Sequence, residues 1–204
     1  MKPFPTTFAS TQQWLNAVET DTQTATSLEA LAFKGYRMQL GLMRADVPSL
    51  QAMSVQDSIR AYCPKDCTKR FADEHTTEQW LKKGRLVFLL KEASSDDLAG
   101  IAWTGPGTSP HILDGKITGG IRVHEDHQGR SLAAPFLSAT LSYTRACYST
   151  DLVWFETWAS NAGAVHTYQK IGFTAIGSDP TPRLLPNHTT APDTRLYMIL
   201  PIDS

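Results

Sequence analysis

The spacing of apolar side chains changes at Arg85. Before it, Leu50, Met53 and Ile59 recur at helical intervals and predict a helix over 44–63. From Arg85 onward, short aliphatic and aromatic runs between turn signals predict strands, and segments with helical spacing separate several of them. This alternation predicts a mixed α/β fold.

The predicted strands form a sheet of about six to seven members flanked by helices. They are 38–43, 85–93, 98–105, 116–123, 151–159, 173–177 and 194–200. Further helices are predicted over 76–84, 131–148 and 161–172, and a Pro-rich loop over 178–194.

Short polar residues indicate where the earlier helices begin. Asp46 is a candidate N-cap with Pro48 in the first turn behind it, and Thr76 or Thr77 is a candidate cap for the next helix.

The amino-terminal part looks peripheral. Trp14, Leu15 and Val18 have the spacing of one short helix, and the polar, Thr-rich segment 19–27 predicts a loop. We therefore expect an extension over 1–36 and one main domain over 37–204.

Composition narrows the class of protein. The chain has 204 residues, 41% of them apolar, and a formal charge of −1, which suits one sizeable core. The balanced charge disfavours a general nucleic-acid binder. An odd count of three cysteines gives no disulfide framework, and no apolar run is long enough for a membrane span. We expect a cytoplasmic protein with no membrane segment.

The first segment with chemical potential runs from Ile121 to Phe136, where a strand ends, a polar turn follows and a helix begins. Helix N-termini present unpaired N–H groups and a partial positive charge, and small residues such as Gly129 and Ser131 let a ligand approach. The segment suits a phosphate or pyrophosphate. The alternative is an ordinary strand-to-helix turn.

The second such segment covers 153–173. Strand alternation puts Glu156 on one face between Trp154 and Trp158, where burial would raise its pKa toward that of a general base. Asn161 can cap the next helix, and Tyr168 lies two turns further along the same face.

Together the two segments resemble the GNAT superfamily of acetyl-CoA-dependent N-acetyltransferases. The coenzyme signature V-x-x-x-x-[QR]-x-x-G-x-[GA] reads Val123, Gln128, Ser131 and Ala133, with serine in place of the glycine. The second motif has Asn161, Ala164, Tyr168, Gly172 and Phe173 at its positions.

The resemblance implies a GNAT fold with the coenzyme between splayed strands 116–123 and 152–159. It implies that Tyr168 protonates the leaving thiolate, that Glu156 takes a proton from the acceptor amine, and that Asn161 contacts the coenzyme arm. The remaining cofactor-binding residues that it implies are Ile121, Arg122, Val123, Gln128, Gly129, Arg130, Ser131, Leu132, Ala133 and Ala134.

Each assignment has a structural alternative. Glu156 can be a carboxylate paired with arginine, Tyr168 a core tyrosine and Arg130 a solvated side chain. His111 and Asp114 are reserve candidates for the base.

We expect no metal. The run His124 to His127 has ligand-type side chains, but adjacent loop residues rarely converge on one ion without partners elsewhere in the chain. Cys63 and Cys67 form a single pair, and a zinc site needs more ligands.

The resulting hypothesis is transfer of acetyl from acetyl-CoA to a primary amine of a small molecule or a peptide N-terminus by direct attack. The alternative is a non-catalytic acetyl-CoA-binding sensor or interaction module. A homodimer is compatible with either. The sequence leaves the acceptor undefined.

Overall fold

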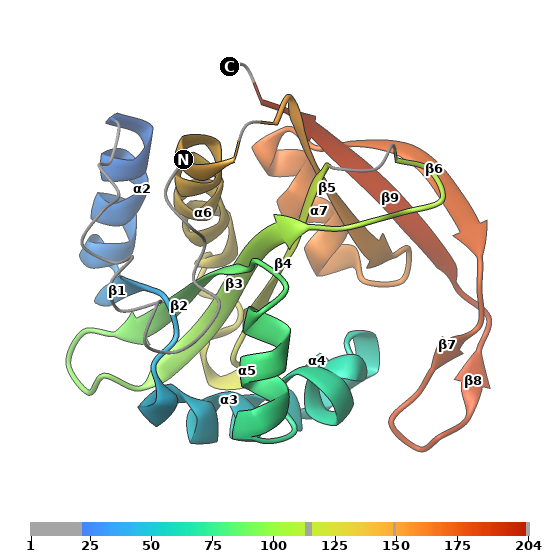
Figure 1. The fold of residues 1–204 in the computed structure, drawn as a ribbon, viewed down its shortest axis with the longest axis horizontal. Helices are drawn as coiled ribbons and strands as arrows, with labels where there is room; N and C mark the ends of the chain where they lie inside the picture. Colours follow the sequence, from blue (N-terminus) through green and yellow to red (C-terminus); the bar gives the residue numbers. More distant parts are fainter. Residues whose placement is uncertain (1–21, 113–115, 149, 203–204) are drawn as a thin grey trace.

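The computed structural model describes residues 22–112, 116–148 and 150–202, and a single seven-stranded sheet runs through it in the order β1-β2-β3-β4-β5-β9-β6. All neighbours are antiparallel except β4 and β5. The strands are β1 (Tyr36–Leu40), β2 (Leu86–Glu92), β3 (Leu98–Pro106), β4 (Ile117–Val123), β5 (Leu152–Trp158), β6 (Thr174–Pro180) and β9 (Thr194–Pro201). The predicted mixed sheet flanked by helices is confirmed (Figure 1).

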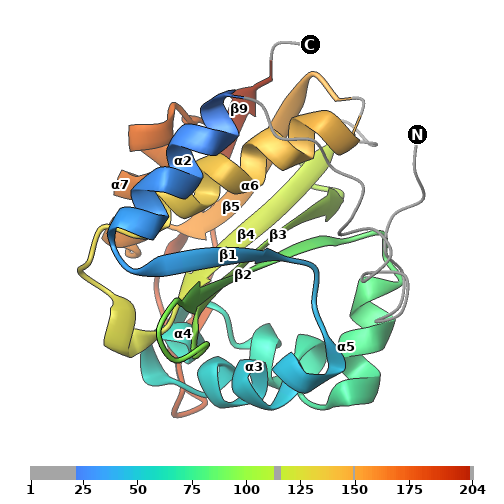
Figure 2. The same ribbon diagram turned by 90° about the vertical axis from the view of Figure 1, so that its left-hand side faces the viewer.

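Helices cover both faces of the sheet (Figure 2). On one face lie α2 (Thr22–Phe33), α6 (Ala133–Cys147) and α7 (Ala162–Ile171). On the other lie α3 (Val47–Ser54), α4 (Asp57–Tyr62) and α5 (Glu74–Leu81), with a 3₁₀ turn η1 (Arg44–Asp46) and a π-helical turn η2 (Asp66–Arg70). We call the second side the α3–α5 face.

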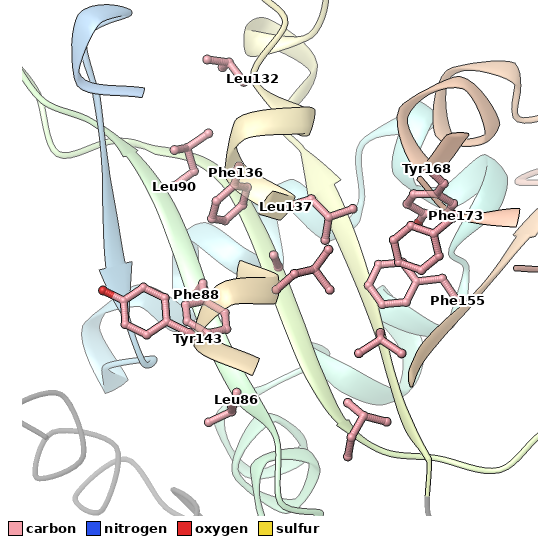
Figure 3. Close-up of a cluster of buried hydrophobic side chains, with 14 of the residues drawn as sticks. Leu86, Phe88, Leu90, Leu132, Phe136, Leu137, Tyr143, Phe155, Tyr168 and Phe173 are labelled. Carbon is pink, nitrogen blue, oxygen red and sulfur yellow. The ribbon is translucent and has the colours of Figure 1, made fainter. Parts of the chain in front are cut away.

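Each face has its own core because strand side chains alternate. Phe88 and Leu90 of β2 pack with α6, and Val87 and Leu89 of the same strand pack with α3 and α5. A strand that is buried on both sides needs a continuous apolar run, which is why 86–90 reads LVFLL. Part of the first core is drawn in Figure 3.

Two sequence predictions in the first half are wrong. Residues 22–27 belong to α2 and not to a loop, because Ser27 and Leu31, one turn apart, are buried and α2 packs on α6. The predicted helix 44–63 is interrupted near Gln56, whose extended backbone (φ −60°, ψ 144°) begins α4 as a separate helix. The predicted helix around Trp14 lies outside the described residues.

The predicted caps also differ. The side chain of Asp46 does not cap α3; its buried carboxylate accepts from Met43 N at 2.8 Å, which closes the start of η1, and pairs with Lys91 at 2.8 Å. Asp73 caps α5 by accepting from Thr76 N at 2.6 Å, so the helix begins two residues earlier than predicted.

The segment predicted as a Pro-rich loop contains structure. β6 continues to Pro180, and a small hairpin of β7 (Arg183–Leu184) and β8 (Thr190–Ala191) follows it. The carboxylate of Asp193 anchors the hairpin by accepting from Arg183 Nε at 2.8 Å and from the Ser160 hydroxyl. In the described part of the chain, no helix has the length and apolarity to cross a membrane.

Candidate active site

The parallel strands β4 and β5 part soon after they begin. Only Ile117 pairs with Val153 and Thr118 with Trp154, although each strand has seven residues. From Gly119 onward β4 stays paired with β3 alone. The sheet therefore opens into a V, and the inner edge of β4 presents backbone groups to it that β5 does not pair.

A cleft of about 1540 Å³ includes this opening. The catalytic candidate Glu156 lines it, as do ten of the residues predicted to bind coenzyme: Ile121, Arg122, Val123, Gln128, Gly129, Ser131, Leu132, Ala133, Asn161 and Tyr168. Arg130 and Ala134 are not among its lining residues.

The turn after β4 leads directly into α6. Gln128 Nε2 donates to Val123 O at 3.0 Å and so closes the turn behind the strand. Gly129 (φ 74°) and Ser131 (φ 56°) both have left-handed backbone, and no side chain caps the helix at Leu132. The left-handed backbone at Ser131 favours glycine, which accounts for the glycine that the family signature has at this position. The uncapped N–H groups leave the start of α6 open to an anion.

The Arg130 side chain is bound to other parts of the protein. Its guanidinium donates to the Tyr36 hydroxyl at 2.8 Å and to Asp126 O at 2.8 Å. The predicted contact of this side chain with coenzyme phosphate stays a prediction.

The ligand-type side chains that precede Arg130 have other partners. His127 Nδ1 lies 2.9 Å from the Tyr36 hydroxyl, and Glu125 accepts from Ser58 N at 2.6 Å. No cluster of three metal-ligand side chains occurs within the described ranges.

Asn161 and Tyr168 occupy the other wall. Asn161 caps α7 by accepting from Ala164 N at 3.2 Å, as predicted. Tyr168 is buried, with its ring 5.2 Å from that of Phe155 and 5.5 Å from that of Phe173 (Figure 3). Burial raises its pKa although Arg122 opposes the shift, so the hydroxyl keeps its proton at neutral pH.

The charge of Glu156 contributes to the raised pKa of Tyr168, but the Glu156 side chain is not buried, contrary to the prediction. Its side chain is 45% exposed and pairs with Arg195 Nη1 at 2.9 Å. Trp154 and Trp158 on either side of it are buried. Arg195 stands 3.9 Å over the Trp158 ring, so this guanidinium, which the sequence did not single out, fixes the carboxylate.

His111, one of the two other candidates for the general base, does not line the cleft. His111 Nε2 lies 3.0 Å from Asp179 Oδ1 and its ring packs on Tyr197 at 4.5 Å, outside the lining of the cleft. Tyr197 is paired with Glu156 across β5 and β9, so His111 stands on the same face of the sheet. Asp114 lies outside the described residues.

Asp66 is a residue that sequence reasoning missed. Its carboxylate is 2% exposed and accepts from Arg122 Nε at 2.8 Å and from Arg70 Nη1 at 2.6 Å. Burial opposes the charge of Arg122, but Asp66 outweighs it and raises the pKa of the guanidinium. An acid in a polar stretch such as PKDCTKR gave no signal of this role.

Cys63 and Cys67 both line the cleft, and burial determines the protonation state of Cys63. It raises the pKa of the Cys63 thiol, which therefore stays protonated at neutral pH and is a poor nucleophile.

A sheet parted between two parallel strands, with an open helix N-terminus at one end of the gap and a protonated tyrosine on its wall, is the architecture of a coenzyme A-dependent acyltransferase. The acetyltransferase (GNAT) family model matches residues 53–173, and the chain belongs to this family. The protein is therefore an acetyltransferase of the GNAT type.

Solved structures share the fold. One is a putative acetyltransferase from Salmonella typhimurium with its cofactor acetyl-CoA (TM-score 0.65, 19% identity, covering 83% of this chain and 95% of that one). Another is spermidine N-acetyltransferase from Vibrio cholerae in complex with CoA and spermine (TM-score 0.62, 16% identity, 81% and 96% covered). A third is an aminoglycoside acetyltransferase in complex with coenzyme A (TM-score 0.60, 15% identity, 80% and 94% covered). No curated protein sequence matches the chain.

Proposed function

We propose that the protein transfers the acetyl group of acetyl-CoA to a primary amine by direct attack. The parting of β4 and β5 next to the open turn at Gly129 and Ser131 is the observation that carries this proposal. The domain over 37–204 would hold the activity, with α2 of the extension packed on α6.

The free edge of β4 suits the amide-bearing arm of coenzyme A. Backbone groups of Ile121 to Val123 would pair with the arm, as a neighbouring strand does. The N–H groups from Gln128 to Ala134 would hold the pyrophosphate, and Asn161 would contact the arm from the other wall.

Acetyl-CoA supplies a thioester whose carbonyl carbon forms a bond with the amine nitrogen while the carbon–sulfur bond breaks. Tyr168 would donate its proton to the departing thiolate, which its burial supports because the phenol is held neutral. Glu156 would accept the proton that the amine loses, directly or through water; its exposure supports access of water. The protonated thiol of Cys63 is consistent with a route that has no covalent enzyme intermediate.

An assay of thiol release from acetyl-CoA across a panel of amines tests the proposal. Steady release that depends on an amine supports it. Tight coenzyme binding without release under any amine would support the non-catalytic module instead, and no coenzyme binding would overturn both.

The assignment of Tyr168 needs a matched control. Tyr168→Phe should lower kcat about 100-fold with coenzyme affinity retained, since a positioned proton donor contributes roughly that much. Tyr143→Phe changes another buried tyrosine of the same core, outside the cleft lining, and should leave kcat unchanged. Equal effects of the two variants would remove the acid role from Tyr168.

A further inference from the structure

The cleft is lined by many more cations than carboxylates. Among the described residues on its wall, Glu156 is the single acid. The eight lysines and arginines there are Arg60, Lys65, Lys69, Arg70, Lys83, Arg85, Arg122 and Arg195. Such an excess sets up a positive potential inside the cavity.

Protein carboxylates neutralise only part of this charge. Asp66 serves Arg70 and Arg122, and Glu156 serves Arg195. Within the described ranges, Lys69, Lys83 and Arg85 have no carboxylate within ion-pair distance.

Arg85 is the most constrained of these unpaired cations. Its Nη1 donates to Pro106 O at 2.7 Å, and its guanidinium lies 4.7 Å over the Trp103 ring. Its Nε is buried and has no hydrogen-bond partner. Arg70 lies 5.4 Å from the same Trp103 ring, so two guanidiniums share one aromatic side chain.

This arrangement is unfavourable without an anion. Burial and the neighbouring Arg70 lower the pKa of Arg85 to about 10, with Tyr148 partly opposing the shift. A buried charge that lacks a partner carries a desolvation cost that a bound carboxylate or phosphate would offset.

The proposed pyrophosphate site is far from Arg85. Arg85 lies over Gly105, where an added Cβ would stand 2.8 Å from Arg85 Cδ, and Gly105 pairs with Thr118 at the start of β4. The pyrophosphate turn follows Val123 at the other end of the strand, about 16 Å away at 3.3 Å per residue.

Arg85 and Trp103 also lie on the face of the sheet that carries Glu156. Trp103 pairs with Gly120, and Thr118 pairs with Trp154, which shares a face with Glu156. An amine directed at Glu156 can therefore extend along this face toward Arg85.

We propose that the acceptor is an amine that also carries an anionic group, carboxylate or phosphate, and that Arg85 with Lys69 and Lys83 binds this group. The inference rests on the proposed function. It separates this protein from enzymes whose acceptors are polycations, such as the spermidine and aminoglycoside acetyltransferases that share its fold.

The test compares acceptors that differ only in the anion. The panel holds α- and ω-amino acids from glycine to 6-aminohexanoate with their amides, dipeptides with their C-terminal amides, phosphoethanolamine with ethanolamine, and spermidine and kanamycin. The best acid should exceed its amide at least tenfold in kcat/KM, and the polycations should be poor acceptors. The carboxylate and phosphate arms of the panel identify the anion.

Variants then locate the anion site. Arg85→Gln should raise KM for the best acid about 10- to 100-fold, the range expected for loss of one charge-assisted hydrogen bond, with kcat near that of the wild type. KM for the matching amide should not change. Lys82→Gln, an exposed lysine next to Lys83 but outside the cleft lining, is the control and should change neither constant.

A second variant guards against loss of folding. The double variant Lys69→Gln/Lys83→Gln changes two exposed side chains and should weaken the acid selectively. A preference for amides or polycations, or equal effects of these variants on acid and amide, overturns the anion site while thiol release still supports the acetyltransferase.

If no amine is acetylated, the proposed function fails, and the anion site is then tested by the binding of acids and amides. Calorimetry on the CoA-loaded protein should then show the free acids binding at least tenfold more tightly than their amides. Equal affinity refutes the site.

Discussion

Asp66 should be among the most costly side chains to neutralise, although the sequence gives no sign of it. Its carboxylate is 2% exposed and accepts from two guanidiniums, and the side chain of Arg122 is itself 13% exposed. Asp66→Asn keeps the shape but leaves Arg122 buried without a counter-ion. Breaking a buried pair from one side costs about 3 to 5 kcal/mol.

The size of the effect can be measured by thermal and urea unfolding. For a domain of this length each kcal/mol lowers Tm by about 2–4 °C, so Asp66→Asn should lower it by about 6–20 °C. Asp96→Asn is the matched control, because Asp96 is 58% exposed and pairs with Arg37, which is 46% exposed. Its second partner, the buried Lys91, keeps Asp46 as a counter-ion at 2.8 Å. An exposed pair contributes about 1 kcal/mol or less.

A double variant separates the buried charge from lost packing. Arg122→Met in the Asp66→Asn background removes the uncompensated charge and should recover part of the lost stability. The reasoning is refuted if Asp66→Asn costs no more than Asp96→Asn, or if the double variant is less stable by the full sum of the two single changes.

Three further results are expected. Burial opposes ionisation of Asp193, but hydrogen bonds from its neighbours outweigh burial and lower the pKa from 3.8 to about 2. The ionised carboxylate therefore stabilises the fold by about 2 kcal/mol above pH 5, and this stabilisation is lost as the pH falls toward 2. The difference in unfolding free energy between wild type and Asp193→Asn should shrink over that window. Ser131→Val should lower the unfolding free energy by about 1–2 kcal/mol and weaken CoA binding, because the backbone φ of 56° there disfavours a β-branched side chain. Ser131→Gly should do neither; thermal melting measures the stability and calorimetry the CoA affinity. Glu156→Gln should lower kcat about 100-fold. The same loss in His111→Ala, with Glu156→Gln active, would transfer the base role to His111.

The sequence predicts best where local chemistry determines structure. Gly172, with φ 107°, ends α7 where predicted, and Asn161 caps it. The alternation in 151–159 places Trp154 and Trp158 correctly on one face of the sheet. Each of these features depends on residues within a few positions of each other.

The features that the sequence did not predict depend on contacts between residues far apart in the chain. α2 forms because Leu31 packs on a helix about a hundred residues later, and Glu156 is exposed because Arg195 on another strand holds it. The direction of the Arg130 side chain is fixed by Tyr36, from the first strand of the sheet. No local spacing contains these partners.

Arg122 lies between the two proposed substrate sites. Its backbone belongs to the free edge of β4, where the coenzyme arm is proposed to pair, and its side chain crosses the α3–α5 face to Asp66 in η2. Asp66 also holds Arg70, which shares Trp103 with Arg85. A shift of η2 on binding the proposed anionic acceptor would therefore act on the strand where the coenzyme arm is proposed to pair. Since Asp66 is 2% exposed and the side chain of Arg122 is 13% exposed, breaking their pair should alter KM for both substrates together, whereas Arg85, Lys69 and Lys83 should alter KM for the anionic acceptor alone.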